Sequence, residues 1–155
     1  MRNETEEERL DRNLMELLQE LRVALPGVQV LFAFLLAVPF YQRWTSVTTF
    51  QRDVYFAALC LALIATALLI SPTAMHRINF RQREKRAIVM ISNRLTIAGM
   101  AVLALAMIAV VVLIGDVLFG PVATVVTGVL AALVFALLWL ALPLRQRMSG
   151  DRSRS

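Results

Sequence analysis

The chain has few side chains that could carry out a reaction. Its 155 residues include one cysteine, Cys60, and one histidine, His76. A disulfide needs two cysteines, and a protein metal site needs several imidazole, thiolate or carboxylate ligands held together. The sequence also lacks a phosphate-binding loop and a nucleophile with a neighbouring base. We therefore expect no catalytic residue, no metal and no cofactor, and we predict that the protein is not an enzyme.

Transport across a membrane would use other side chains, because ionisable groups inside a bilayer mark ion pathways and proton relays. We expect none of them within the apolar stretches, since every Asp and Glu falls in a predicted terminal segment, loop or tail. The polar residues within the stretches are Gln29, Thr66, Thr96, Thr124 and Thr127. For Gln29 we predict a hydrogen bond between helices, with a substrate contact as the alternative.

Four apolar stretches must position these residues. Each is close to the roughly 20 residues that cross the hydrocarbon core of a bilayer. The composition agrees, since 59% of the residues are hydrophobic and only 17% are charged. We predict an all-α integral membrane protein, with one membrane domain over residues 1–155 built as a four-helix bundle. The predicted spans cover residues 26–41, 54–71, 95–115 and 121–143.

Basic residues are distributed unevenly between the two sides that these spans define. Four crossings place both termini in one compartment, which then holds 14 of the 16 Lys and Arg residues. Only Arg43 and Arg52 lie on the other side. Short cytoplasmic loops of membrane proteins are rich in Lys and Arg, so both termini are predicted to be cytoplasmic. The excess of arginine over lysine suggests a GC-rich genome, and we expect a multi-pass protein of a bacterial plasma membrane.

The N-terminal segment, residues 5–25, has the pattern of an amphipathic helix. Its leucines recur at helical spacing and form one stripe, while acidic and basic residues occupy the other faces. Pro26 and Gly27 then interrupt the pattern. We predict an interfacial helix that bends at this point into the first span; the alternative is one long helix kinked at Pro26. The stripe consists of Leu10, Leu14, Leu17, Leu18, Leu21 and Leu25.

The boundaries of the connections are less sharply defined by the sequence. Pro72 is expected to end the second span, and residues 72–94 to form a basic cytoplasmic connection. The third span could enter lipid at Ala87 or at Leu95, and we prefer Leu95 because the earlier start would place Arg94 about 10 Å deep. On the other side, residues 115–121 are predicted to form a turn that includes Asp116. The basic tail, residues 144–155, is expected to be flexible.

Two short motifs concern the ends and faces of the helices. Thr48 and Gln51 have the spacing of a capping box at the start of the second helix. Small residues recur every four positions on two spans, which lets helix backbones approach closely. We predict that these rows pack within the bundle, with a dimer interface as the alternative. The rows contain Ala58 and Ala62 on the second span, and Gly128, Ala132 and Ala136 on the fourth.

The charged segments suggest partners. The basic residues between the second and third spans are expected to bind anionic lipid headgroups at the cytoplasmic face. We also hypothesise that the acidic N-terminal helix packs along this basic connection, residues 76–94. No aromatic platform is interleaved with the basic residues, so we expect no nucleic-acid partner.

The chain resembles DUF6328, a family of uncharacterised bacterial membrane proteins common in actinobacteria. The resemblance rests on residues 16–23 (ELLQELRV), residues 27–36 (GVQVLFAFLL), His76-Arg77 with Phe80-Arg81, and Asn93-Arg94-Leu95. It implies four spans and no established activity, and a sodium/proton antiporter label carried by some members implies transport as an alternative. It also indicates a group of polar residues as a candidate site or interface: Glu16, Glu20, Arg22, Gln29, His76, Arg77, Asn93 and Arg94.

Taken together, these features predict a non-enzymatic structural, regulatory or accessory subunit that acts through helix and lipid contacts. A small ion or solute transporter or channel, assembled from several copies, is the alternative. The expected protein partner is a second copy of the chain or a larger membrane protein.

Overall fold

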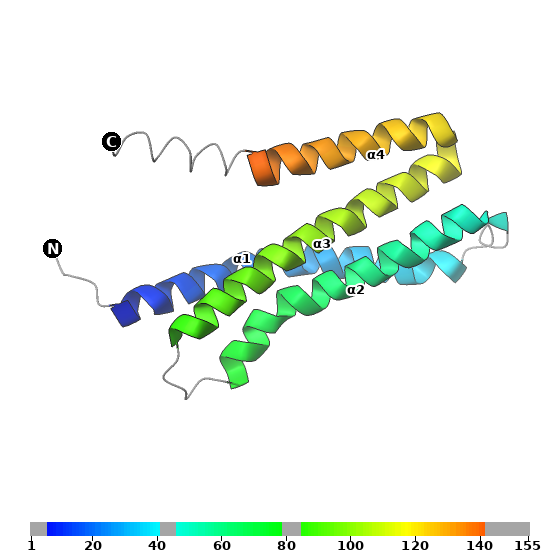
Figure 1. Ribbon diagram of the computed structural model, residues 1–155. Coiled ribbons are helices and arrows are strands. Elements are labelled where there is room, and N and C mark those ends of the chain that lie inside the picture. The colour runs from blue at the N-terminus through cyan, green and yellow to red at the C-terminus, as the bar shows by residue number, and fades with distance from the viewer. Residues whose placement is uncertain (1–5, 41–45, 79–84, 142–155) are drawn as a thin grey trace, which may run out of the picture.

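A computed structural model of the full chain describes residues 6–40, 46–78 and 85–141. Every element in these ranges is helical, so the predicted all-α class is confirmed. Figure 1 shows the helices running back and forth along one common direction. The elements are α1 (Glu6–Ala37), the short 3-10 helix η1 (Val38–Phe40), α2 (Thr49–Ile78), α3 (Lys85–Phe119), α4 (Pro121–Ala136) and a π-helical turn, η3 (Leu137–Ala141).

Four of these helices are long and apolar enough to cross a membrane, so the chain is a multi-pass membrane protein. α1, α2 and α3 contain 32, 30 and 35 residues. At about 1.5 Å per residue, they are about 45–52 Å long. The hydrocarbon core is only about 30 Å thick. Each of these three helices therefore extends well beyond the hydrocarbon.

Two prolines at predicted helix boundaries lie inside helices, and for Pro26 the structure has the alternative of one long helix. α1 continues through Pro26, and α2 continues through Pro72 to Ile78. The N-terminal segment is therefore the first half of one long helix and does not form a separate interfacial helix. The expectation that Pro72 ends the second helix was wrong. Membrane helices tolerate proline because neighbouring helices and local adjustments compensate for the lost backbone hydrogen bond.

The connection predicted for residues 72–94 is also largely helical. α2 contributes residues 72–78 and α3 contributes residues 85–94, so Arg94 lies about 14 Å along α3 at about 1.5 Å per residue. The leucine stripe of α1 packs against α2 and α3. Leu14, Leu17 and Leu21 are buried, and Leu17 and Leu21 belong to a cluster with Leu69 of α2. The stripe thus faces other helices of the same chain, not a lipid surface.

A second cluster forms the core at the opposite end of α1, α2 and α3. Leu35 of α1 meets Tyr55 and Ala58 of α2 and Leu113 of α3. Tyr55 is only 7% exposed. Its hydroxyl donates a hydrogen bond to the carbonyl oxygen of Leu35, at 3.0 Å. This bond joins the end of α1 to the beginning of α2.

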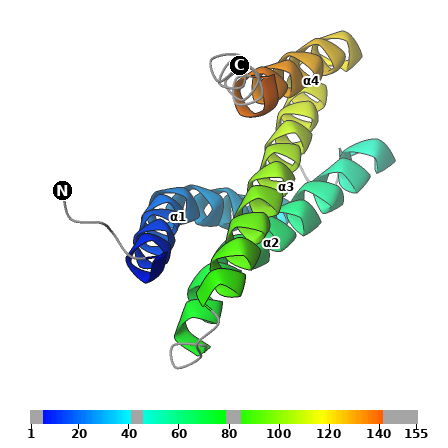
Figure 2. The same ribbon diagram turned by 60° about the vertical axis from the view of Figure 1, so that its left-hand side comes forward.

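α4 is attached differently from the other helices. Among the described elements outside its own C-terminal turn, it contacts α3 alone. Figures 1 and 2 show that α4 leaves the turn close to α3 and diverges from it toward its C-terminal end. The four helices therefore form a three-helix core with a fourth helix appended to α3.

A single residue, Gly120, separates α3 from α4. Its φ of 83° lies in a region that favours glycine, and Pro121 occupies the first turn of α4. The turn predicted over residues 115–121 is consequently shorter than expected. Gly115 and Asp116 belong to α3, and a Cβ atom at Gly115 would lie 3.2 Å from the Cα atom of Thr124 in α4. Gly115 thus allows the two backbones to approach closely.

Candidate functional site

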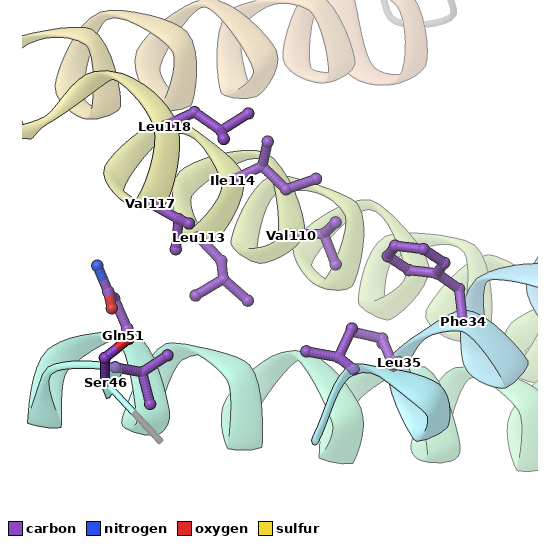
Figure 3. A pocket seen from close by; sticks show the side chains of 11 residues that line it. Phe34, Leu35, Ser46, Gln51, Val110, Leu113, Ile114, Val117 and Leu118 are labelled. Atoms are coloured by element: carbon purple, nitrogen blue, oxygen red, sulfur yellow. The ribbon is translucent and has the colours of Figure 1, made fainter. Parts of the chain in front are cut away.

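The structure contains a pocket of about 390 Å³ between α1, the start of α2 and the end of α3. Figure 3 shows apolar side chains from α1 and α3 on its walls and the Gln51 side chain at one end. Its size is within the range of about 300–1,000 Å³ typical of small-molecule sites. The lining residues are Phe34, Leu35, Val38, Ser46, Val47, Gln51, Val110, Leu113, Ile114, Val117 and Leu118.

Hydrogen bonds fix the orientation of the Gln51 amide at the end of this pocket. The backbone N–H of Thr48 donates to Gln51 Oε1 at 3.0 Å, and the N–H of Gln51 donates to Thr48 Oγ1 at 3.2 Å. The predicted capping box is therefore confirmed. Gln51 Nε2 also donates to Asp116 Oδ2 at 2.8 Å. The amide thus links the beginning of α2 to the last turn of α3.

Asp116 lies in a different element from the one predicted. It was expected in a loop, but it lies inside α3 and is half-buried. Among the described residues, no basic side chain forms an ion pair with it. The Gln51–Asp116 contact joins residues 65 positions apart, and no pattern in the sequence signals it. The pocket consequently offers apolar walls, an oriented amide and a carboxylate behind that amide.

The four threonines predicted as polar residues of the spans are satisfied within their own helices. Each hydroxyl donates to a carbonyl one turn earlier, at 2.7–3.0 Å, so none of them contributes a polar link to another helix in this way. The bonds join Thr66 to Ala62, Thr96 to Ser92, Thr124 to Gly120 and Thr127 to Ala123.

Gln29 lies exposed on α1. The predicted hydrogen bond to another helix is not formed within the described part of the chain. Gln29 is not among the residues that line the pocket either.

The other members of the predicted polar group lie at the opposite end from the pocket. Glu16, Glu20 and Arg22 are exposed on α1, Arg77 is exposed in the last turn of α2, and Asn93 and Arg94 are exposed on α3. His76 belongs to α2, but its side chain lies outside the described part. Glu16 forms an exposed 3.7 Å ion pair with Arg12 of its own helix. The hypothesis that the acidic helix packs along the basic connection involves residues 79–84, which are also outside the described ranges.

The small residues of the predicted packing rows differ in their surroundings. Ala58 and Ala62 are fully buried in the three-helix core. Gly128 is buried against α3, and a Cβ atom there would lie 2.8 Å from Val112 Cγ2. Ala132 and Ala136 are exposed on α4.

One buried hydroxyl has no hydrogen-bond partner in the described part of the chain. Ser92 of α3 is 0% exposed, and its Oγ atom is unpaired. Burying a hydroxyl without a hydrogen bond costs about 1–3 kcal/mol.

Replacing Ser92 with alanine is therefore expected to raise the free energy of unfolding by about 1 kcal/mol. Denaturant titration in micelles measures the free energy of unfolding. The control is Thr96→Val, which removes a hydroxyl that has a hydrogen bond. A loss of stability in Ser92→Ala would contradict the prediction.

Comparison with known proteins gives the family. Residues 3–143 match the model described as "Family of unknown function (DUF6328)". No curated protein and no solved structure matches the chain. The match covers nearly the whole sequence, including all described elements from α1 to the turn after α4. The chain therefore belongs to the DUF6328 family, and it is a four-span, all-helical membrane protein of that family.

Proposed function

We propose that this protein is a non-enzymatic accessory or regulatory subunit of a bacterial plasma membrane. It acts by packing its helices against a larger membrane protein and against lipid. The observation that supports this most is the one-sided attachment of α4, which contacts α3 and leaves its other faces free of the three-helix core. Those faces are apolar and exposed, through Val122, Val125, Val126, Val129, Leu130 and Leu133.

Close packing between helices would hold such a partner against α4. Lipid tails are as apolar as these side chains, so helices associate in a bilayer mainly where their surfaces fit closely. Ala132 and Ala136 are small and exposed on α4. A partner helix placed there would approach α4 closely and also cover the exposed part of α3.

The charged end of the core supports the proposed orientation. Among the exposed basic residues of α1, α2 and α3, Arg52 lies beside Gln51 at the pocket end. The others lie toward the opposite end of the helices: Arg9, Arg12, Arg22, Arg77 and Arg94. We propose that this end is cytoplasmic, with both termini on that side, and that it binds anionic headgroups. Each basic side chain near such a surface contributes about 1 kcal/mol. No nucleic-acid partner is part of this proposal.

A photo-crosslinking amino acid at Val129 tests the accessory role in living cells. We expect it to join the chain to one membrane protein, which also co-purifies with the chain in a fixed ratio. Phe56 of α2 is exposed to a similar degree, at 64% against 53% for Val129, and serves as the matched control position. Val125→Trp, on the same face of α4, should remove the partner. Equal capture from Val129 and Phe56 would contradict the proposal.

The pocket favours a second candidate, a small solute transporter or channel assembled from several copies. Its support is the half-buried Asp116 carboxylate that Gln51 holds next to the apolar pocket. Purified protein in liposomes would then conduct or exchange a solute, and Asp116→Asn would abolish the flux. Solute flux through liposomes that contain only the purified protein would favour transport over the accessory role. Liposomes that show no flux would contradict the transport candidate.

A further inference from the structure

We propose that two copies of this chain associate through α1, with their Gln29 side chains hydrogen-bonded to each other in the middle of the bilayer. The contact is independent of the α4 surface, because α1 and α4 do not touch in one chain.

Gln29 is isolated among apolar residues. It is the only polar side chain in residues 23–40, which form the second half of α1 and the short helix η1. The helical segment ends at Phe40, 11 residues away, which is about 16 Å at about 1.5 Å per residue. The hydrocarbon core is about 30 Å thick. A helix end at the membrane surface therefore places Gln29 near the midplane.

The amide needs a partner at that depth. It has two N–H donors and a carbonyl acceptor, and the hydrocarbon supplies neither water nor protein groups to pair with them. Gln29 is exposed on α1, and no other described residue of the chain forms a hydrogen bond with it. An unpaired amide facing lipid is unfavourable, so a partner outside this chain stabilises the helix.

Small residues lie beside the amide on the same face. Ala33 and Ala37 follow Gln29 at four-residue spacing, and all three are exposed. Rows of small residues let two membrane helices approach closely, and a polar side chain then forms a bond between them. The surface of α1 combines both features.

The chemistry of the amide indicates a second copy as the partner. A carboxamide both donates and accepts, so two identical amides related by a twofold axis satisfy each other. Such an axis also brings the same alanine row of each chain together, because a twofold contact uses one surface twice. No complementary group from another protein is required.

The experiment measures self-association of the full chain in liposomes by energy transfer between labelled copies at increasing dilution in lipid. The native Cys60 is replaced by alanine in all variants, and the label is attached to a cysteine at Ser149. Gln29→Leu is expected to weaken association about ten-fold. Gln29→Asn, which keeps a carboxamide, should retain most of it, and Val30→Leu, a change between apolar residues at the neighbouring exposed position, should have little effect.

Oxidative crosslinking locates the contact. Ala33→Cys should form a dimer disulfide, whereas Val125→Cys on exposed α4 should not. Unchanged association in Gln29→Leu, or equal crosslinking from both positions, would overturn the proposal. A dimer that crosslinks through Val125→Cys alone would assign self-association to α4, and would also overturn it. Capture of a different protein at Val129 bears on the accessory role and leaves this test unaffected.

Discussion

Tyr55→Phe is expected to lower the free energy of unfolding by about 1–3 kcal/mol, the cost of leaving a buried hydrogen-bonding group unpaired. The reason lies in Pro39. In a continuing helix, the N–H of residue 39 would donate to the carbonyl of Leu35, but proline has no N–H. The Tyr55 hydroxyl takes this role, at 3.0 Å from the Leu35 oxygen, in the buried cluster that joins α1, α2 and α3.

Thr66→Val is the matched control for this prediction, because it also removes a bonded hydroxyl from α2. The acceptor there, the carbonyl of Ala62, lies four residues before Thr66 in the same helix, so it keeps the backbone N–H of residue 66. Its cost should stay below about 0.5 kcal/mol, as for substitutions that leave no buried group unpaired. Denaturant titration in lipid micelles measures both values.

A double-mutant cycle tests the assignment to Pro39. Pro39→Ala restores a backbone N–H at that position, so Tyr55→Phe should cost less in this background than in the native one. Equal costs in the two backgrounds would show that the hydroxyl does not replace the missing donor.

Gly115→Leu is expected to displace α4 from α3. A Cβ atom at Gly115 would lie 3.0 Å from Thr127 Oγ1 and 3.2 Å from the Cα atom of Thr124. A backbone atom cannot rotate away as a side chain does, so the helices must separate. Among the described elements, α4 contacts no core helix other than α3, so packing against another helix does not offset the clash. The distance between the axes should increase toward the upper end of the usual range of about 8–10 Å.

Spin labels measure this separation. Cysteines at Met107 of α3 and Leu133 of α4, both exposed, carry the labels in a chain whose Cys60 is alanine. Gly27→Leu is the matched control, because a Cβ atom at Gly27 meets nothing within 4 Å. An unchanged distance in Gly115→Leu would mean that the close approach does not position α4. If α4 is the surface that binds a partner, the same variant should also reduce crosslinking from Val129.

The sequence located the four apolar helices because their composition is dictated by the bilayer. It placed the ends poorly. Pro26 and Pro72 signal helix ends in soluble proteins, but here the following residues continue a packed helix whose neighbours stabilise it. Gly120 supplies the whole turn between α3 and α4, so Asp116, expected in a loop, lies in α3.

The sites were harder to predict than the helices. The capping box of Thr48 and Gln51 is local, and its three-residue spacing made it predictable. The bond from Gln51 to Asp116 depends on how α2 and α3 pack, and it has no local signal. Tyr55 shows the same limit. An aromatic residue near a membrane surface fits a lipid-facing belt, and only the packing of α1 against α2 reveals that its hydroxyl serves Leu35.

The one-residue turn at Gly120 also bears on how the protein reaches its final state. With so short a link, α3 and α4 start out as neighbours, and closing the loop between them costs little chain entropy. During synthesis, the pair should leave the translocation machinery as a helical hairpin, inserted together after α1 and α2. Lengthening that turn with glycine and serine should let the last helix emerge on its own. The longer turn should reduce the rate of assembly more than it reduces the stability of the folded protein.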